Sequence, residues 1–378
     1  MKYPIGIQDF EDLQRNGYAY VDKTNFVYKL ADEGKYYFLS RPRRFGKSLF
    51  LSTLEAYFQG KKELFEGLAI YDLETEWKKY PIFHIDLNTA NFREKDSLYT
   101  VLNDYLTTWE SKYGTRESEA TLALRFKGVI ARAAEKEGCG VVILIDEYDK
   151  PILQTLRAPE LQAEHRAQLK AFYSVLKTQD RYIKFAFLTG VTKFGKVSVF
   201  SDLNNLTDIS MDHRYISICG MTEKELLTNF KEGIGELASA NEDNETETID
   251  KLRMRYSGYH FEENSEEIYN PFSVLNTLAN SRYDDYWFKA DTHTFLIDIL
   301  KKHDYCITDL NKAQVKANMM NNVDFNPIPV IYQSGYLTIK SYDERFKNYQ
   351  LGIPNKEVEE GILNTLLPHG CKTAEMDC

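Results

Sequence analysis

The chain has 378 residues, a length that predicts roughly two to three domains. It is 43% apolar and 28% charged, and Tyr and Phe (26 and 22) outnumber Gly and Pro (20 and 10). This composition argues against disordered and fibrous proteins. The formal net charge of −10 argues against a protein whose whole surface binds nucleic acid or membrane, although a local basic patch is compatible with it.

The sequence gives no sign of a membrane span or a secretion signal. The longest aliphatic run, Val141 to Ile145, is far shorter than the roughly 20 residues of a spanning helix, and Met1 to Gly6 lacks the apolar core of a signal peptide. The cysteines are scattered, odd in number and without a CxxC pair, which argues against disulfides and structural zinc. We therefore expect a cytoplasmic protein with no membrane partner. The cysteines are Cys139, Cys219, Cys306, Cys371 and Cys378.

Apolar runs alternate with helix-like stretches over the first 220 residues or so, which predicts an α/β fold with a parallel sheet and flanking helices. The spacing of Leu51, Leu54 and Phe58 predicts a helix after the first strand. Five runs are expected to be strands: Tyr36–Leu39, Ile82–Leu87, Val141–Ile145, Ile183–Leu188 and Tyr215–Ile218.

The rest of the chain has a different pattern. The polar stretch Ala240–Glu247 predicts an exposed loop near a domain junction, and helices are expected at Pro271–Asn280 and Thr294–Lys301. Tyr336–Lys340 and Tyr349–Ile353 flank a polar turn, which predicts a β-hairpin. We expect a core over residues 1–220, a helical lid over 221–300, and a winged-helix-like module with a truncated tail over 301–378.

Directly after the first predicted strand, Ser40 to Ser48 (SRPRRFGKS) leads into the predicted helix. A phosphate-binding loop needs backbone N–H groups around the β-phosphate, a lysine for the β- and γ-phosphate oxygens, and a hydroxyl for Mg²⁺; the N-terminus of the following helix adds positive field. Gly46, Lys47 and Ser48 fit these requirements. The residues expected to bind nucleotide are Arg43, Arg44, Phe45, Gly46, Lys47, Ser48 and Leu49.

This loop departs from the usual GxxxxGK[ST] pattern at one position. Arg41 stands where the first glycine would be, and that glycine normally permits a positive φ. The alternative to a phosphate loop is a basic surface turn.

An acidic strand end is the second feature. Val141–Ile145 lacks alternation, which is typical of a central parallel strand buried on both faces, and Asp146 and Glu147 follow it directly. Ligands of open α/β sheets bind at the carboxyl ends of the strands. We expect Asp146 to hold Mg²⁺ with Ser48, and Glu147 to activate the attacking water. The alternative is a strand end with solvated acids, but the lysine loop upstream favours one nucleotide site at which Lys47, Asp146 and Glu147 converge.

The fourth predicted strand ends in Leu188-Thr189-Gly190-Val191-Thr192. A polar residue at this position is suited to contact the γ-phosphate or the attacking water. Thr189 is the first candidate for this catalytic role and Thr192 the second, and the alternative is a Thr-Gly turn.

Taken together, these residues resemble the AAA-ATPase-like bacterial proteins that usually carry a PD-(D/E)XK nuclease-like domain at the C-terminus. The resemblance covers nearly the whole chain. It rests on the blocks Pro4–Phe10, Tyr20–Thr24, Phe38–Ser48, Ile145–Pro151, Asn204–Asp208, Tyr269–Ser273, Tyr332–Leu337 and Gly352–Val358.

The resemblance implies a P-loop ATPase core with an inserted central strand, an Asp-Glu strand end, and kinship with signalling ATPases in which the nucleotide state drives domain rearrangement. An arginine in place of the first loop glycine is itself typical of the family. The nuclease-like domain is expected to be absent, since only 23 residues follow Asn355. The triplets Glu33-Gly34-Lys35 and Glu110-Ser111-Lys112 are not in a nuclease setting. We therefore expect no nuclease activity.

Several single features have two interpretations each. Asp22-Lys23-Thr24 either shapes the base site or starts a helix. Arg214 is either a γ-phosphate sensor or, more in keeping with most exposed arginines, part of a surface ion pair. His84 fits a packed core residue better than a ligand. Arg41, Arg43 and Arg44 can bind phosphates, act in trans as arginine fingers, or pair with acids of the same chain.

The function favoured by these observations is Mg²⁺-dependent binding and hydrolysis of ATP, used as a conformational switch. One alternative is a nucleotide-binding module with negligible turnover. Another is a nucleic-acid interaction protein regulated by ATP, with the winged-helix-like module as reader. A DNA or protein effector and a homo-oligomer are compatible with the sequence, which identifies neither.

Overall fold

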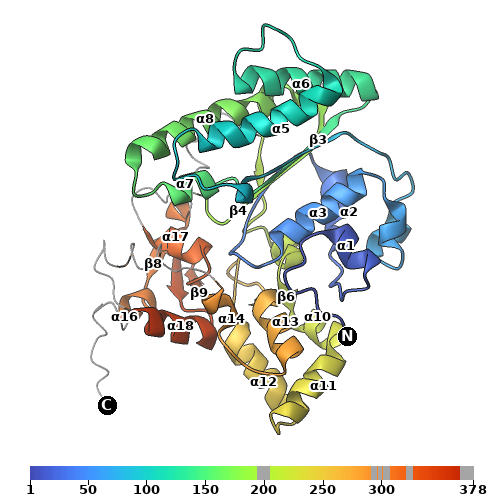
Figure 1. The fold of residues 1–378 in the computed structure, drawn as a ribbon. Coiled ribbons are helices and arrows are strands. Elements are labelled where there is room, and N and C mark those ends of the chain that lie inside the picture. Colours follow the sequence, from blue (N-terminus) through green and yellow to red (C-terminus); the bar gives the residue numbers. More distant parts are fainter. Residues whose placement is uncertain (194–204, 291–295, 297–299, 301–306, 321–326, 367–378) are drawn as a thin grey trace.

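The computed structural model describes residues 1–193, 205–290, 296, 300, 307–320 and 327–366. A five-stranded parallel sheet runs through its larger part (Figure 1), with the order β2-β3-β4-β1-β5. Because β4 lies between β1 and β3, the expected inserted central strand is confirmed. The strands are β1 (Tyr36–Ser40), β2 (Ile82–Asp86), β3 (Val141–Asp146), β4 (Ile183–Gly190) and β5 (Thr207–Asp208).

Helices cover both faces of the sheet, as the unbroken apolar runs of β1 and β3 require. Leu39, Leu144 and Phe187 pack with α1 to α4 on one face, and Phe38 and Ile143 pack with α5, α6 and α8 on the other (Figure 1). These helices are α1 (Phe10–Arg15), α2 (Thr24–Glu33), α3 (Lys47–Phe58), α4 (Ala69–Leu73), α5 (Ser97–Tyr113), α6 (Leu122–Glu137), α7 (Lys150–Gln154) and α8 (Pro159–Thr178).

The predicted fifth strand, Tyr215–Ile218, is wrong. Residues His213–Ile218 form a 3₁₀ segment, and the strand beside β1 is the two-residue β5. The apolar side chains of Tyr215 and Ile216 are buried without any sheet pairing, because their carbonyls accept hydrogen bonds from Arg41 instead. Thr207 and Asp208 carry no apolar run that would indicate a strand.

A second, mainly helical region follows the sheet. Of the predicted loop Ala240–Glu247, only residues 241–244 connect two helices. Ala240 ends α11, and the remaining residues form the first turn of α12, because Asn244 caps that helix through a capping box. Helix α13 has the predicted bounds, whereas most of the helix predicted at 294–301 lies outside the described residues. The elements are β6 (Met221–Thr222), α10 (Glu223–Asn229), α11 (Lys231–Ala240), α12 (Glu245–Tyr256), β7 (Ile268–Tyr269), α13 (Pro271–Asn280) and α14 (Tyr286–Lys289).

The C-terminal region contains the predicted hairpin, formed by β9 (Thr338–Asp343) and β10 (Asn348–Gly352). β8 (Gln314–Lys316), which was not predicted, pairs with β10 to complete a three-stranded antiparallel sheet. Around it lie α16 (Ile307–Leu310), α17 (Pro327–Gln333) and α18 (Lys356–Leu366). Side chains of this region share one hydrophobic cluster with the first part of the chain, so the regions are packed together. The division at 220 and 300 stays a prediction, and the tail from 367 lies outside the described residues.

Among the described helices, none combines the length and the apolar character that a membrane crossing would require.

Candidate functional site

The loop between β1 and α3 places the lysine motif at the carboxyl end of the sheet. Gly46 has φ +95° and immediately precedes α3, which begins at Lys47. Arg44 also has a positive φ, +67°. Arg41 does not have a positive φ. The loop therefore begins without the left-handed conformation that usually requires a glycine at this position. The left-handed residues lie instead near its end.

Lys47 and Glu147 meet at this edge. The Lys47 Nζ lies 3.1 Å from a Glu147 carboxylate oxygen, and the two side chains are 3% and 13% exposed. The same ammonium donates to the carbonyls of Arg41 (3.1 Å) and Pro42 (3.3 Å). Glu147 has a left-handed φ of +52°, a conformation that costs energy in a residue other than glycine and concentrates at functional sites.

Asp146 is the centre of a hydroxyl and carboxylate cluster. Ser48 Oγ donates to one of its oxygens and Thr189 Oγ1 to the other, each at 2.5 Å, while the Glu147 N–H donates to Oδ1 at 3.0 Å. Burial raises the pKa of Asp146 and the Glu147 carboxylate raises it further, whereas the hydrogen bonds from Ser48 and Thr189 oppose the rise. The structure therefore brings Lys47, Ser48, Asp146, Glu147 and Thr189 together from three strand ends.

The oxygens of Ser48 and Asp146 suit Mg²⁺, which prefers hard oxygen ligands and commonly takes one or two carboxylates plus substrate phosphates. In the described ranges, no three His, Cys, Asp or Glu side chains gather as a metal cluster. A magnesium ion here would thus draw its remaining ligands from nucleotide and water.

The other residues expected to bind nucleotide lie around this point in different ways. Gly46 and Leu49 line a cleft. Arg43 and Arg44 are exposed, and the Arg44 guanidinium lies over the Phe272 ring at 5.0 Å. Phe45 is buried against Tyr259, so its side chain supports the loop, and its carbonyl accepts from the Gly220 N–H at 2.9 Å.

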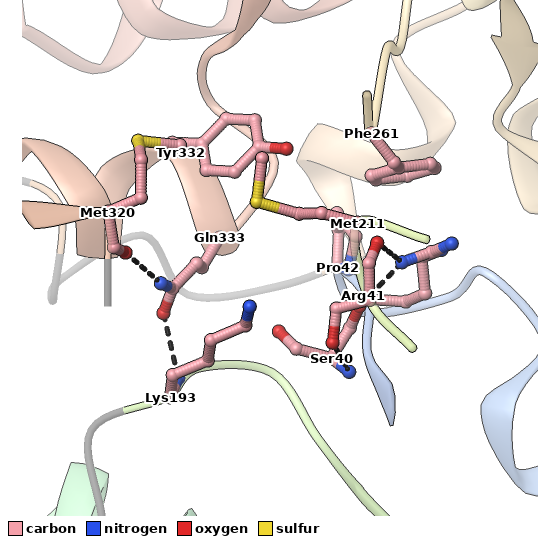
Figure 2. A pocket seen from close by; sticks show the side chains of 10 residues that line it. Ser40, Arg41, Pro42, Lys193, Met211, Phe261, Met320, Tyr332 and Gln333 are labelled. Atoms are coloured by element: carbon pink, nitrogen blue, oxygen red, sulfur yellow. Dashed lines mark hydrogen bonds between the residues drawn. The ribbon is translucent and has the colours of Figure 1, made fainter. Parts of the chain in front are cut away.

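Arg41 points away from the lysine cluster. Its guanidinium donates to the carbonyls of Ser40, Ser210, Tyr215 and Ile216 at 2.7 to 3.3 Å. Figure 2 shows the Phe261 ring above it, with 4.0 Å from the guanidinium carbon to the ring centre. Of the three roles open to this arginine, the structure shows an internal one, although its partners are carbonyls and not acids.

A cleft with about 570 Å³ of empty space lies beside Gly46. The N-terminal segment (Tyr20, Val21) forms part of its wall, and Met221 and Phe230 of the helical region form another. Lys23 also lines it and is paired with Glu225 of α10 at 2.5 Å, which ties these walls together. Its lining is mainly apolar, as is typical of small-molecule sites.

Asp22-Lys23-Thr24 starts a helix, as one of its two interpretations predicted, and its part in a base site stays a prediction. Helix α2 begins at Thr24, and the Asp22 carboxylate accepts from the Thr24 N–H at 2.8 Å. Lys23, between them, reaches the cleft.

The two remaining single features are settled by their contacts. Arg214 is 46% exposed and paired with Asp212 at 2.7 Å, which agrees with a surface ion pair. His84 is only half-buried and pairs with Glu55 at 2.7 Å. The expected packed core histidine is thus only partly right, because a carboxylate on α3 takes up the ring nitrogen.

Sequence reasoning did not single out Tyr148 and Asp149, which contact residues just after the end of β4. Thr192, the second candidate for phosphate contact, donates through its hydroxyl and its N–H to the Asp149 carboxylate, both at 2.7 Å, and its contact with phosphate stays a prediction. The signal was present in the block Asp146-Glu147-Tyr148-Asp149, but nothing in the sequence shows which carboxylate turns inward.

Comparison with known proteins agrees with this geometry. The family described as Predicted AAA-ATPase matches residues 4–200. An uncharacterized protein from the vnfD 5′ region of Azotobacter chroococcum mcd 1 is 38% identical over 372 residues, which cover 97% of this chain and 70% of that protein. The family suggests nucleotide binding and an ATPase. The chain therefore belongs to the AAA-ATPase-like family.

Proposed function

We propose that this protein binds ATP with Mg²⁺ and hydrolyses it, and that the nucleotide state acts as a conformational switch. The observation that carries the proposal is the convergence of Lys47, Ser48, Asp146 and Glu147, with 3.1 Å between Lys47 and Glu147 and 2.5 Å between Ser48 and Asp146. Phosphoryl transfer needs mainly positioning and charge neutralisation, which this set supplies.

Each side chain has a distinct part in the proposal. The Lys47 ammonium would exchange its carbonyl contacts and Glu147 for the phosphate oxygens, and Ser48 and Asp146 would hold Mg²⁺, which neutralises phosphate charge when bound. Glu147, released from Lys47, would accept the proton of the attacking water. Thr189 would hold Asp146 in place and lie beside the terminal phosphate.

The cleft beside Gly46 is the best candidate for the base. It begins where the phosphate loop ends, and a flat purine ring fits a mainly apolar lining that includes Tyr20, Leu49 and Phe230. The location supports a nucleotide whose phosphates lie at Lys47 and whose base lies between the N-terminal segment and the helical region.

Contacts between the site and the later regions support the switch. The Trp287 indole N–H donates to the Arg43 carbonyl at 3.0 Å. The Lys193 N–H, three residues after Gly190 in the chain, donates to Gln333 of α17 at 2.7 Å. A nucleotide that moves the phosphate loop or the β4 exit would therefore change contacts with α14 and α17.

The test is ATP hydrolysis by the purified chain with Mg²⁺, compared with Glu147→Gln. We expect the variant to bind ATP but to lose about 100-fold or more in turnover, as for loss of a general base. Wild-type turnover in Glu147→Gln would show that the base is assigned wrongly. Tight ATP binding by wild type without phosphate release would favour the nucleotide-binding module with negligible turnover. The Lys47–Glu147 ion pair is also compatible with that module, because in this structure the proposed base is bound to the proposed phosphate lysine.

The nucleic-acid alternative places the reader in the winged-helix-like module. The turn of its hairpin, residues 344–347, is exposed, whereas every residue of α17 is buried, so in this arrangement the hairpin is open to a partner and α17 is not. Repeating the ATPase assay with DNA, and measuring DNA binding across salt concentrations, tests this alternative.

A further inference from the structure

The residues that follow β4, Val191 and Thr192, are called the exit loop here, and a buried carboxylate holds them. This carboxylate, Asp149, has no part in the ATPase mechanism proposed above. Asp149 is 0% exposed. It accepts hydrogen bonds from the Val191 N–H (3.2 Å), the Thr192 N–H (2.7 Å) and the Thr192 hydroxyl (2.7 Å). Burying a carboxylate costs energy unless hydrogen bonds compensate, and here the compensating donors all come from two consecutive residues of one loop.

The loop also fits closely against Tyr148. A Cβ on Gly190 would lie 2.6 Å from the Tyr148 ring and 2.7 Å from an Asp149 oxygen, so only glycine allows this approach. The Tyr148 N–H donates to the Thr189 carbonyl at 3.0 Å, and its hydroxyl donates to the Thr192 carbonyl at 2.9 Å. The loop is thus fixed at both ends.

Thr189, the last residue but one of β4, is the neighbour of this loop that reaches the site. Its hydroxyl donates to Asp146 Oδ1 at 2.5 Å, and its side chain is fully buried. Since Thr189 is separated from Val191 by Gly190 alone, the hydrogen bonds to Asp149 hold the chain immediately after Thr189. Glycine has no side chain that could hold the backbone by itself.

We propose that Asp149 is a positioning residue for ATP hydrolysis. By accepting hydrogen bonds from Val191 and Thr192, Asp149 keeps the Thr189 hydroxyl against Asp146. Thr189 in turn orients the Asp146 carboxylate, which is proposed to hold Mg²⁺, and lies where the γ-phosphate is expected. This inference rests on the proposed function and adds a residue to it. Asp149 itself does not reach the reacting atoms, because its carboxylate is taken up by the loop.

The competing explanation is that Asp149 only stabilises the fold. Asp149→Asn separates the two explanations. The amide keeps the shape of the side chain, but its NH₂ group cannot accept hydrogen bonds from Val191 and Thr192 as the carboxylate oxygen does. We expect turnover to fall by about 30-fold, with ATP affinity within about 3-fold of wild type, as for an interaction needed in the transition state. A purely structural role would lower the melting temperature and leave kcat per folded molecule unchanged.

Thr192 provides an independent test if Asp149→Asn fails to fold. Thr192→Val keeps the side-chain shape and removes the hydroxyl, and we expect about a 5-fold lower kcat, while Thr192→Ser should restore most of it. The matched control is Thr248→Val in α12, where the buried hydroxyl bonds only within the helical region, to the Asn244 carbonyl at 3.0 Å. It should lose stability without losing kcat.

Wild-type kcat in folded Asp149→Asn, or equal kcat in Thr192→Val and Thr192→Ser, would overturn the proposal. If wild type binds ATP but releases no phosphate, the hydrolysis proposed above fails, and amide hydrogen exchange of the ATP-bound protein then decides the positioning role. Faster exchange at Val191, Thr192 and the adjoining Thr189 in Asp149→Asn would support it, and unchanged exchange would contradict it.

Discussion

The loop between β1 and α3 buries one cation at each end, and the two cations have opposite surroundings. Lys47 is 4% exposed and faces Glu147 at 3.1 Å, whereas Arg41 is 1% exposed and faces neutral carbonyls and the Phe261 ring. Figure 2 shows Arg41 in the second setting, near Lys193, Gln333 and Tyr332.

The difference follows from the chemistry of the two groups. A guanidinium is planar, weakly hydrated and rich in donors, so it can satisfy several carbonyls and stack on a ring. An ammonium is a compact charge that can exchange one oxygen partner for another. Arg41 thus joins the loop to residues 210–216, while Lys47 keeps a partner that phosphate can replace. Burial lowers the pKa of Arg41 to about 10, so it remains a cation at neutral pH.

The largest effect is expected for Lys47→Met. Removing the ammonium deletes the charge-assisted contacts to phosphate, so ATP affinity should fall by about 100-fold or more. Isothermal calorimetry with Mg-ATP measures it. Affinity close to wild type would contradict the assignment of Lys47 as the phosphate lysine.

Arg41→Met is expected to act on stability first. The substitution leaves the Ser210, Tyr215 and Ile216 carbonyls without their donor, and an unsatisfied buried group costs about 1–3 kcal/mol. Urea unfolding should show a loss of about 2–4 kcal/mol, larger than the loss in Lys47→Met. A loss no larger than that of Lys47→Met would contradict the internal structural role of Arg41.

A third prediction concerns Glu357, which lies in the region that touches the loop through Trp287. Burial raises the pKa of this carboxyl to about 8, while the hydrogen bonds from the Trp287 N–H and the Ser273 hydroxyl oppose the rise. Because the folded state holds the proton more tightly than the unfolded state, the folded protein should lose stability as the pH rises from about 4.5 to about 8, at about 1.4 kcal/mol for each unit of pKa difference.

Glu357→Gln isolates this contribution. The variant carries no charge, so its stability relative to wild type should increase between pH 5 and pH 8, as measured by chemical unfolding at both values. A constant difference between the two proteins would mean that Glu357 has an ordinary pKa.

The smallest effect is expected for Arg214→Ala. Its ion pair with Asp212 lies at the surface, and such pairs contribute little to stability because water screens them. Unfolding free energy and ATP turnover should both stay near wild type. A loss of turnover in a stable variant would revive the γ-phosphate sensor.

Much of the fold could be predicted because its signals are local. The runs that became β1 to β4 are mainly apolar, with His84 in β2 and Lys184 in β4 as polar interruptions, and Gly46-Lys47-Ser48 lies between a strand and a helix. β5 and β8 could not be found in this way, since they are two and three residues long and owe their conformation to pairing with β1 and β10. The segment at Tyr215 was wrongly predicted as a strand because its apolar residues indicate only that its side chains are buried. They do not indicate whether its carbonyls pair with a neighbouring strand or accept hydrogen bonds from a guanidinium.

Local sequence patterns were enough to predict the family, the parallel sheet and the proposed site residues Lys47, Ser48, Asp146 and Glu147, because a strand–loop–helix motif and an acidic strand end each occupy consecutive residues. The packing of distant segments was needed to turn Arg41 inward to the backbone, to place Asp149 against the β4 exit loop, and to cover α17. These outcomes depend on partners more than 40 residues away, and which distant groups compete for one donor or acceptor is fixed only when the chain is packed.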